Sequence, residues 1–197
     1  MTKAEFWTGE SYLASQLGVS VLVPRAKQIR LLSWEKPQEG QLKLNIDAAY
    51  KDGRAGYGGI IRNSQGQLVF AFGVQGCSSS ALQAEVESLL GCLRRCVSEG
   101  YDKLHIEVDS LQLVNMIHHK AANWTMQNKI TQITTLIQAS GSTLNHIFRE
   151  RNMAADWIAK QVWKTRQGMM FFQGTTDRAM QRVVQLEICG LPQLRMG

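Results

Sequence analysis

The order of strand-like and helix-like segments is the feature that most constrains the fold of this chain. Apolar and polar residues alternate in "LKLNIDAAY" (42–50), which predicts a strand with an apolar face and a polar face. The segments "AGYGGIIRN" (55–63) and "GQLVFAFGVQG" (66–76) read as two more strands, joined by a tight turn at "NSQG". We therefore expect an antiparallel meander. The glycines of "GRAGYGG" (53–59) are expected to form the turn into its second strand and not a phosphate loop, because no helix follows them.

The segments downstream alternate between helix and strand. They are, in chain order, a helix at 80–100, a strand at 103–110, helices at 111–120 and 124–140, a strand at 142–150 and a helix at 152–164. Strand–helix–strand connections require crossovers, so we expect an α/β protein with a five-stranded mixed sheet, in the order βββαβααβα, and helices packed on it. The expected parts are an N-terminal extension (1–40), a domain (41–165) and a C-terminal tail (166–197).

Two acidic residues occupy unusual places in the predicted strands. Asp47 lies on the polar face of the first strand without an obvious local partner, and an unpaired carboxylate in a sheet is costly. Asp109 ends the fourth strand and points away from its apolar face. Functional sites in open sheets gather beyond the carboxyl ends of strands, so both residues are candidates for a site.

Two further acids lie on predicted helices. At about 100° per residue, Glu85 falls on the flank of its helix that meets the sheet, whereas Glu87 is expected to face water. Asp156 falls in the first turn of the last helix, where the helix dipole favours an acid and where Asn152 is a candidate cap.

Each of these acids also has a purely structural interpretation. Asp156 can be a helix-start acid only, Asp109 a cap of the following helix, and Glu85 a solvated helix residue. If the four carboxylates converge, however, they repel one another and raise one another's pKa values. Hard divalent cations such as Mg²⁺ remove that penalty, and two of them can clamp the attacking and leaving oxygens of a phosphodiester.

Composition narrows the class of protein. The 197 residues carry a net charge of +6, which favours a polyanionic partner such as nucleic acid. Four cysteines without a CxxC pair favour buried free thiols and an intracellular, reducing compartment. We expect neither a signal peptide nor a membrane span, because the N-terminal segment has early acids and no clean apolar run.

Five segments carry a resemblance to a known family. In order and spacing, the chain from about Trp34 to Trp163 resembles the ribonuclease H family, most closely the plant-type ribonuclease H-like domains associated with reverse transcriptases. The matching segments are "WEKPQEGQLKLNIDAA", "GYGGIIRNSQG", "LQAEVESLL", "IEVDSLQLV" and "FRERNMAADWIAK". The resemblance implies a ribonuclease H-like fold and a metal-dependent endonuclease. Such an enzyme hydrolyses the RNA strand of RNA–DNA hybrids by a two-metal-ion mechanism and leaves 5′-phosphate and 3′-hydroxyl ends.

The resemblance also implies roles for particular residues. The four metal-binding and catalytic carboxylates would be Asp47, Glu85, Asp109 and Asp156, holding two Mg²⁺ ions for which Mn²⁺ can substitute. Hybrid would be recognised through 2′-hydroxyls across its wide minor groove. The residues expected to contact nucleic acid are Ala48, Ala49, Tyr50, Ser78, Ser79, Ser80, Arg149, Arg151 and Asn152.

Two alternatives stay open at the level of sequence. One is a domesticated, non-catalytic module that binds nucleic acid or protein with the same fold, although such a module has no use for four clustered carboxylates. The other is a nuclease that uses the same site on DNA or on junctions. The oligomeric state, protein partners and the distinction between a free-standing protein and a retroelement fragment are likewise left open.

Overall fold

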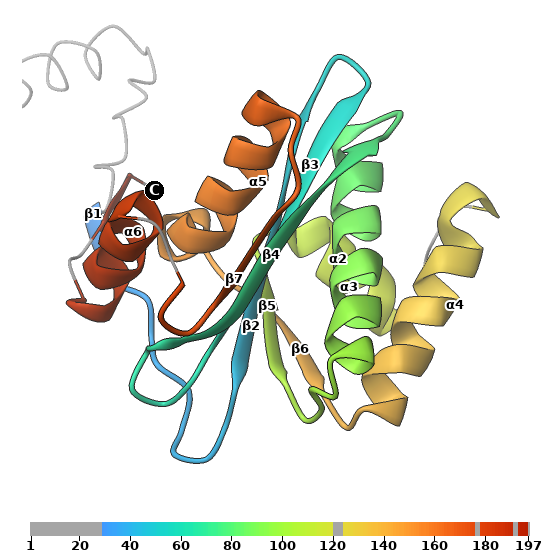
Figure 1. Ribbon diagram of the computed structural model, residues 1–197. Coiled ribbons are helices and arrows are strands. Elements are labelled where there is room, and N and C mark those ends of the chain that lie inside the picture. The colour runs from blue at the N-terminus through green and yellow to red at the C-terminus, as the bar shows by residue number, and fades with distance from the viewer. Residues whose placement is uncertain (1–28, 120–123, 176–177, 191–192, 197) are drawn as a thin grey trace, which may run out of the picture. The chain divides into compact units, whose positions relative to one another are not determined.

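The three strand-like segments form the expected antiparallel meander in a computed structural model, which describes residues 29–119, 124–175, 178–190 and 193–196. The meander is the centre of a six-stranded sheet in the order β6-β5-β2-β3-β4-β7 (Figure 1). Its strands are β2 (Lys43–Lys51), β3 (Arg54–Arg62), β4 (Leu68–Cys77), β5 (His105–Val108), β6 (Thr143–His146) and β7 (Met169–Phe172). β5 runs parallel to β2 and to β6, while the other pairs are antiparallel. The sheet is therefore mixed, as predicted.

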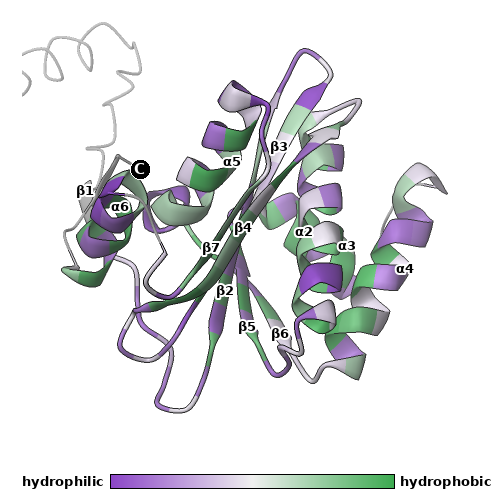
Figure 2. Cartoon of the chain, viewed as in Figure 1, coloured by the Kyte–Doolittle hydropathy of each residue, from purple (hydrophilic) through white to green (hydrophobic). Residues whose placement is uncertain are grey.

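Helices cover both faces of this sheet (Figure 1). One face carries α2 (Ala81–Ser98), α3 (Leu111–His119) and α4 (Trp124–Ala139). The other face carries α5 (Met153–Thr165), preceded by a short 3₁₀ turn (Arg149–Arg151), and α6 (Arg178–Ile188). Figure 2 shows hydrophobic and hydrophilic sides along α2, α4 and α5. The helices bury their hydrophobic sides because apolar surface removed from water is the main source of folding free energy.

The sheet has six strands and not the five expected. β7 comes from the segment expected to be a tail, and it pairs with β4. Its sequence, "MMFF", is too short to show a period. Met169 and Phe171 pack against the core on one side, while the partly exposed Phe172 places its ring 5.1 Å from that of Phe70. Residues Leu31–Arg195 form one compact unit.

The glycines that follow β2 do not share one role. Only Asp52 and Gly53 make the turn, and both have positive φ. Gly58 lies inside β3, where an added Cβ would lie 2.7 Å from the backbone nitrogen of Ala159. The absence of a side chain at this position lets α5 rest directly on the sheet.

The predicted helix caps have different outcomes. The Ser80 side chain accepts a hydrogen bond from the Gln83 N–H, so Ser80 caps α2 as expected. Asn152 precedes α5 but makes no capping bond with its side chain. A further strand pair, β1 (Ile29–Leu32) with β8 (Gln193–Met196), forms a separate two-stranded sheet. Within the described ranges, none of the helices has the length and apolar character needed to span a bilayer.

Candidate active site

Three carboxylates from distant parts of the sequence meet at one end of the parallel strands. Asp47 lies in β2, Glu85 in α2, and Asp109 directly after β5; each offers an oxygen within 4.8 Å of the others. The parallel register pairs Ile46 with Val108, so the acids that follow these two residues lie side by side. The sheet therefore brings together two acids that are 62 residues apart.

Side-chain hydrogen bonds fix the strand that carries Asp47 to helices on both faces. From α2, the Ser88 hydroxyl donates to the main-chain oxygen of Asp47 at 2.8 Å. From the start of α5, the Asn152 amide donates to the main-chain oxygen of Ile46 at 2.9 Å. Both donors are buried, and each bond aligns a helix with the strand. Glu85, about one turn before Ser88, is thereby held over the strand.

Asp156 lines the same cavity but is not one of the three closest carboxylates. The cavity measures about 600 Å³ and is lined by all four predicted acids. The oxygens of Asp156 lie 2.7 Å from the Lys160 ammonium and 3.4 Å from the Arg149 guanidinium. Asp156 therefore has cationic partners, both largely exposed, whereas the other three acids face one another.

The carboxylates of the cluster oppose one another's ionisation. Burial raises the pKa of Asp47 well above its ordinary value, and the charges of Asp109, Glu85 and Asp156 raise it further. Burial and Asp109 raise the pKa of Glu85 to about 8, against the attraction of Arg149. Burial also raises the pKa of Asp109, with Arg149 opposing and Asp156 adding to the shift. A cation placed among these groups would relieve both effects.

The donors present fit a hard divalent cation. All are carboxylate oxygens, which Mg²⁺ prefers as protein ligands. Glu85 Oε2 is buried without a hydrogen-bond partner, which is a costly state for a carboxylate oxygen unless it serves a ligand. Asp47, Glu85 and Asp109 are the residues placed to hold such an ion, with Asp156 beside them.

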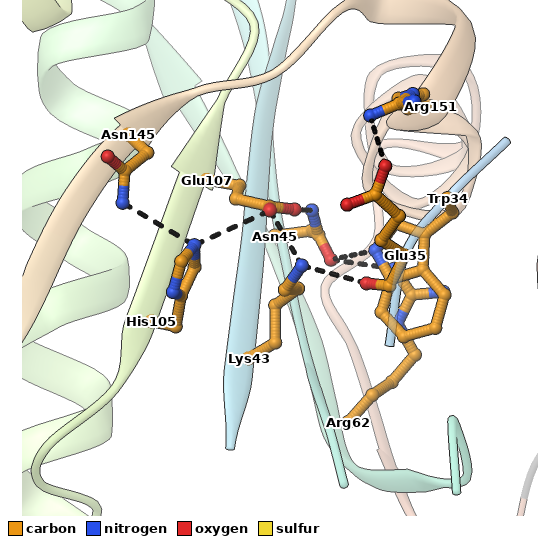
Figure 3. Close-up of polar contacts among 9 residues, drawn as sticks. All are labelled: Trp34, Glu35, Lys43, Asn45, Arg62, His105, Glu107, Asn145 and Arg151. Carbon is orange, nitrogen blue, oxygen red and sulfur yellow. Dashed lines mark hydrogen bonds and ion pairs between the residues drawn. The ribbon is translucent and has the colours of Figure 1, made fainter. Parts of the chain in front are cut away.

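A neighbouring acid on the same face of the sheet shows the contrast. Glu107 lies two residues before Asp109, but its oxygens bind the Lys43 ammonium at 2.7 Å and the Asn45 amide at 2.9 Å (Figure 3). Trp34 donates in turn to Asn45 at 3.0 Å. Glu107 is thus paired within the protein, and the structure does not offer it as a ligand.

The structural alternative for Asp109, a cap of the helix that follows it, can now be judged. Ser110, and not Asp109, caps α3, because its hydroxyl accepts from the Leu113 N–H at 3.3 Å.

The expectation that Glu87 faces water is wrong. Its carboxylate accepts hydrogen bonds from Tyr57, Ser78, Gln83 and Lys129. Burial would raise the pKa of Glu87, but these bonds outweigh it and lower the pKa to about 2.

The residues predicted to contact nucleic acid lie in different surroundings. Ala48, Ala49, Tyr50 and Arg149 line the acidic cavity. The other five lie elsewhere: Ser78 is buried against Tyr57 and Glu87, Ser79 bonds Gln83, Ser80 caps α2, Asn152 is buried against β2, and Arg151 pairs with Glu35. The nucleic-acid contacts remain predictions for all nine residues.

Three lining residues on α5 were missed at the level of sequence: Lys160, Trp163 and Lys164. They follow Asp156 by one and two helical turns, so their spacing was the available signal. Arg54 lies over the Trp163 ring, with its guanidinium carbon 4.9 Å from the ring centroid. The acidic cluster thus has a basic and aromatic border.

Comparison with known proteins agrees with this arrangement. The family model described as "Reverse transcriptase-like" matches residues 45–162. A provisionally named ribonuclease H protein of Arabidopsis thaliana is 25% identical over 193 residues, which is 93% of this chain and 30% of the relative. This chain therefore spans less than a third of that relative's length.

Solved structures share the fold. Ribonuclease H1 of Halobacterium salinarum has a TM-score of 0.59 at 19% identity, over 64% of this chain and 99% of its own. LC11-RNase H1, isolated from compost and solved with an RNA/DNA hybrid, has a TM-score of 0.58 at 18% identity, over 64% and 99% of the two chains.

The fold is thus the ribonuclease H fold, and the acidic cluster lies at the ends of its parallel strands. The chain belongs to the reverse transcriptase-like family, whose matched region contains all four predicted acids.

Proposed function

We propose that this protein is a metal-dependent endonuclease that hydrolyses the RNA strand of RNA–DNA hybrids and leaves 5′-phosphate and 3′-hydroxyl ends. The observation that carries the proposal is the set of three carboxylates within 4.8 Å of one another. All three have raised pKa values, and none of them forms a described ion pair like those of Asp156 with Lys160 and Arg149. The similarity to ribonucleases H, one of them solved with hybrid, supports the choice of substrate.

The chain's own residues account for binding and alignment. Asp47, Glu85, Asp109 and Asp156 would hold two Mg²⁺ ions, which would supply an activated water and neutralise charge at the phosphodiester. Lys160 and Lys164, on the border of the cavity, attract the phosphate backbone. The main chain at Ala48–Tyr50 reaches the 2′-hydroxyls of the RNA strand. The cysteines are free, but only Cys92 and Cys96 are buried as expected, whereas Cys77 and Cys189 are exposed. Free thiols support an intracellular, reducing compartment as part of the proposal.

The experiment compares cleavage of four labelled substrates: RNA–DNA hybrid, double-stranded RNA, double-stranded DNA and a four-way junction. Each is incubated with Mg²⁺ or with EDTA, using the wild type, Asp109→Asn and the matched surface variant Asp102→Asn. Asp102 is exposed and lies outside the cavity. We expect hybrid cleavage by the wild type and by Asp102→Asn, and loss of cleavage in EDTA and in Asp109→Asn.

Other outcomes select the alternatives. Metal-dependent cutting of the junction or of DNA in preference to hybrid would show that the proposed substrate is wrong, while the proposed metal site would still stand. Tight binding of hybrid without metal-dependent cutting of any substrate would favour the non-catalytic module. Extension of the cleaved RNA by a polymerase that needs a 3′-hydroxyl tests for the 3′-hydroxyl end of the product.

A further inference from the structure

The helix that carries Asp156 begins without a cap of its own. The first N–H groups of a helix have no partner within the helix and need one from elsewhere. Asn152 occupies the capping position of α5, but its side chain is turned to Ile46 in β2. The start of α5 therefore depends on an acceptor from outside the helix.

Glu187 supplies that acceptor from α6. Its Oε1 atom accepts a hydrogen bond from the Ala154 N–H at 3.3 Å, although Glu187 lies 33 residues further along the chain. Its other oxygen pairs with the Arg62 guanidinium of β3. Glu187 is 3% exposed, and a carboxylate buried to this extent persists only when its oxygens are paired. A negative charge at this end of α5 also complements the helix dipole.

Arg62 is itself fixed in place. It is fully buried, its guanidinium carbon lies 3.5 Å from the Trp34 ring centroid, and it donates to Asn45 at 2.6 Å (Figure 3). Burial lowers the pKa of Arg62, while Glu187 raises it and favours the charged form. Glu187 is therefore held by a rigid partner in the centre of the sheet.

Apolar contacts bring α6 into this position. Met180 and Val184 of α6 are buried against Ala154, Ala155 and Ile158 of α5. Glu187 follows Val184 by about one turn and so reaches the end of α5 where the helix begins. Both Trp34 and Glu187 lie outside residues 45–162, the region that defines the family.

Asp156 is two residues after Ala154 in the same helical turn. Its N–H donates a hydrogen bond to the main-chain oxygen of Asn152 at 3.1 Å. The orientation of that turn decides where the Asp156 carboxylate lies. We infer that Glu187 is a positioning residue for Asp156: it orders the first turn of α5, so that the C-terminal segment outside the family region completes the metal site. The inference rests on the proposed function, because it gives Asp156 a role as ligand.

The test uses two full-length double variants that both lack the buried charge pair. Arg62→Met with Glu187→Gln keeps an amide oxygen for the Ala154 N–H, whereas Arg62→Met with Glu187→Met has no acceptor there. Mn²⁺ affinity is measured by calorimetry, and amide hydrogen exchange is measured at residues 153–156. We expect the double variant with Glu187→Met to bind Mn²⁺ about 10-fold more weakly than the double variant with Glu187→Gln, the scale found for groups that orient metal ligands. We also expect faster exchange at residues 153–156 in the double variant with Glu187→Met.

A third variant separates positioning from stability. Val184→Ala removes apolar contacts of α6 but leaves Glu187, so it should lower the melting temperature without weakening Mn²⁺ binding. Equal Mn²⁺ affinity and equal exchange in the two double variants would overturn the inference. Failure of the wild type to bind Mn²⁺ would instead overturn the proposed function, and the exchange comparison would still decide whether Glu187 orders α5.

Discussion

Gly58 lies directly opposite Asp47 in the β2–β3 ladder, and α5 packs over the space that a side chain of residue 58 would fill. The same helix carries Asp156, and its start is bonded to β2 through Asn152. The absence of a side chain at Gly58 thus sets how closely Asp156 approaches Asp47. The geometry of the candidate site depends on backbone packing as much as on the acids themselves.

The first prediction follows from that packing. Gly58→Ala would place a Cβ 2.8 Å from the Ala155 oxygen and still closer to the Ala159 nitrogen, and neither backbone atom can rotate away. We expect α5 to shift, with a loss of about 1–3 kcal/mol in the free energy of unfolding and weaker hybrid cleavage. Urea unfolding and cleavage assays measure the two effects.

Gly91→Ala is the matched control for Gly58→Ala. Gly91 lies in α2, and no atom lies within 4 Å of an added Cβ. Alanine there should raise the free energy of unfolding by up to about 1 kcal/mol, because it favours the helix. A Gly58→Ala protein as stable and active as the wild type would contradict the packing argument.

The second prediction separates two neighbouring acids on α2. Glu85→Gln should lower hybrid cleavage by about 100-fold, the scale for removing one electrostatic group from an active site. Without metal, the free energy of unfolding of this variant should equal or exceed that of the wild type, because the substitution removes repulsion from Asp47 and Asp109.

Glu87→Gln should show the opposite pattern. It weakens charged hydrogen bonds from Tyr57, Ser78 and Lys129, so we expect a loss of about 1–3 kcal/mol in the free energy of unfolding with cleavage retained. Steady-state kinetics and urea unfolding distinguish the two variants. Equal losses of activity in Glu85→Gln and Glu87→Gln would contradict a catalytic role that Glu85 has and Glu87 lacks.

The third prediction concerns pH in the absence of metal. The pKa of Glu85 is raised from 4.5 to about 8, so the folded protein keeps a proton that the unfolded chain has already lost in this range. The stabilisation is fully present below pH 4.5 and is lost as the pH rises through about 8. The melting temperature in EDTA should therefore fall over this window.

Metal reverses that dependence. Ligands must lose their protons to bind, so Mg²⁺ affinity should rise between about pH 5 and about pH 8. Thermal melts at several pH values with and without Mg²⁺ measure both trends, and Glu85→Gln should flatten the slope in EDTA. A melting temperature in EDTA that increases toward pH 8 would contradict the repulsion among the acids.

The fourth prediction concerns the basic border of the cavity. Lys164 lines the cavity. In the described part of the chain, no hydrogen bond or ion pair joins it to Asp47, Glu85 or Asp109. Lys164→Ala should weaken hybrid binding at low salt and reduce the slope of log K against log salt by about 0.9, the value for one phosphate contact. Filter binding in EDTA at several salt concentrations measures the slope without cleavage.

Lys103→Ala is the matched control for Lys164→Ala, because Lys103 is exposed and lies at the opposite end of β5 from Asp109. It should leave both affinity and slope unchanged. Identical slopes for wild type and Lys164→Ala would place the phosphate backbone elsewhere on the protein.

Local sequence pattern was sufficient for much of this fold. Alternation over 42–50 predicted β2 and the face on which Asp47 lies, and the helical period placed Glu85 on the side of α2 toward the sheet. The pattern failed where an element is short or where a partner is distant. β7 has four residues and is recognised only by its pairing with β4, and Glu87 was assigned to water although Lys129 and Tyr57 reach it from other elements.

The sequence by itself determined the strands β2 to β6, the helices α2 to α5 and the α/β class, and it singled out the four acids as candidates, because periodicity and chain order are local properties. Tertiary structure alone decided which acids face one another and which are neutralised. Asp47, Glu85 and Asp109 converge through strand register and helix packing, whereas Asp156 meets Lys160 and Arg149. Glu107, on the same face, is paired with Lys43. Coulomb interactions and desolvation depend on distances through space, and those distances are fixed only when distant segments pack.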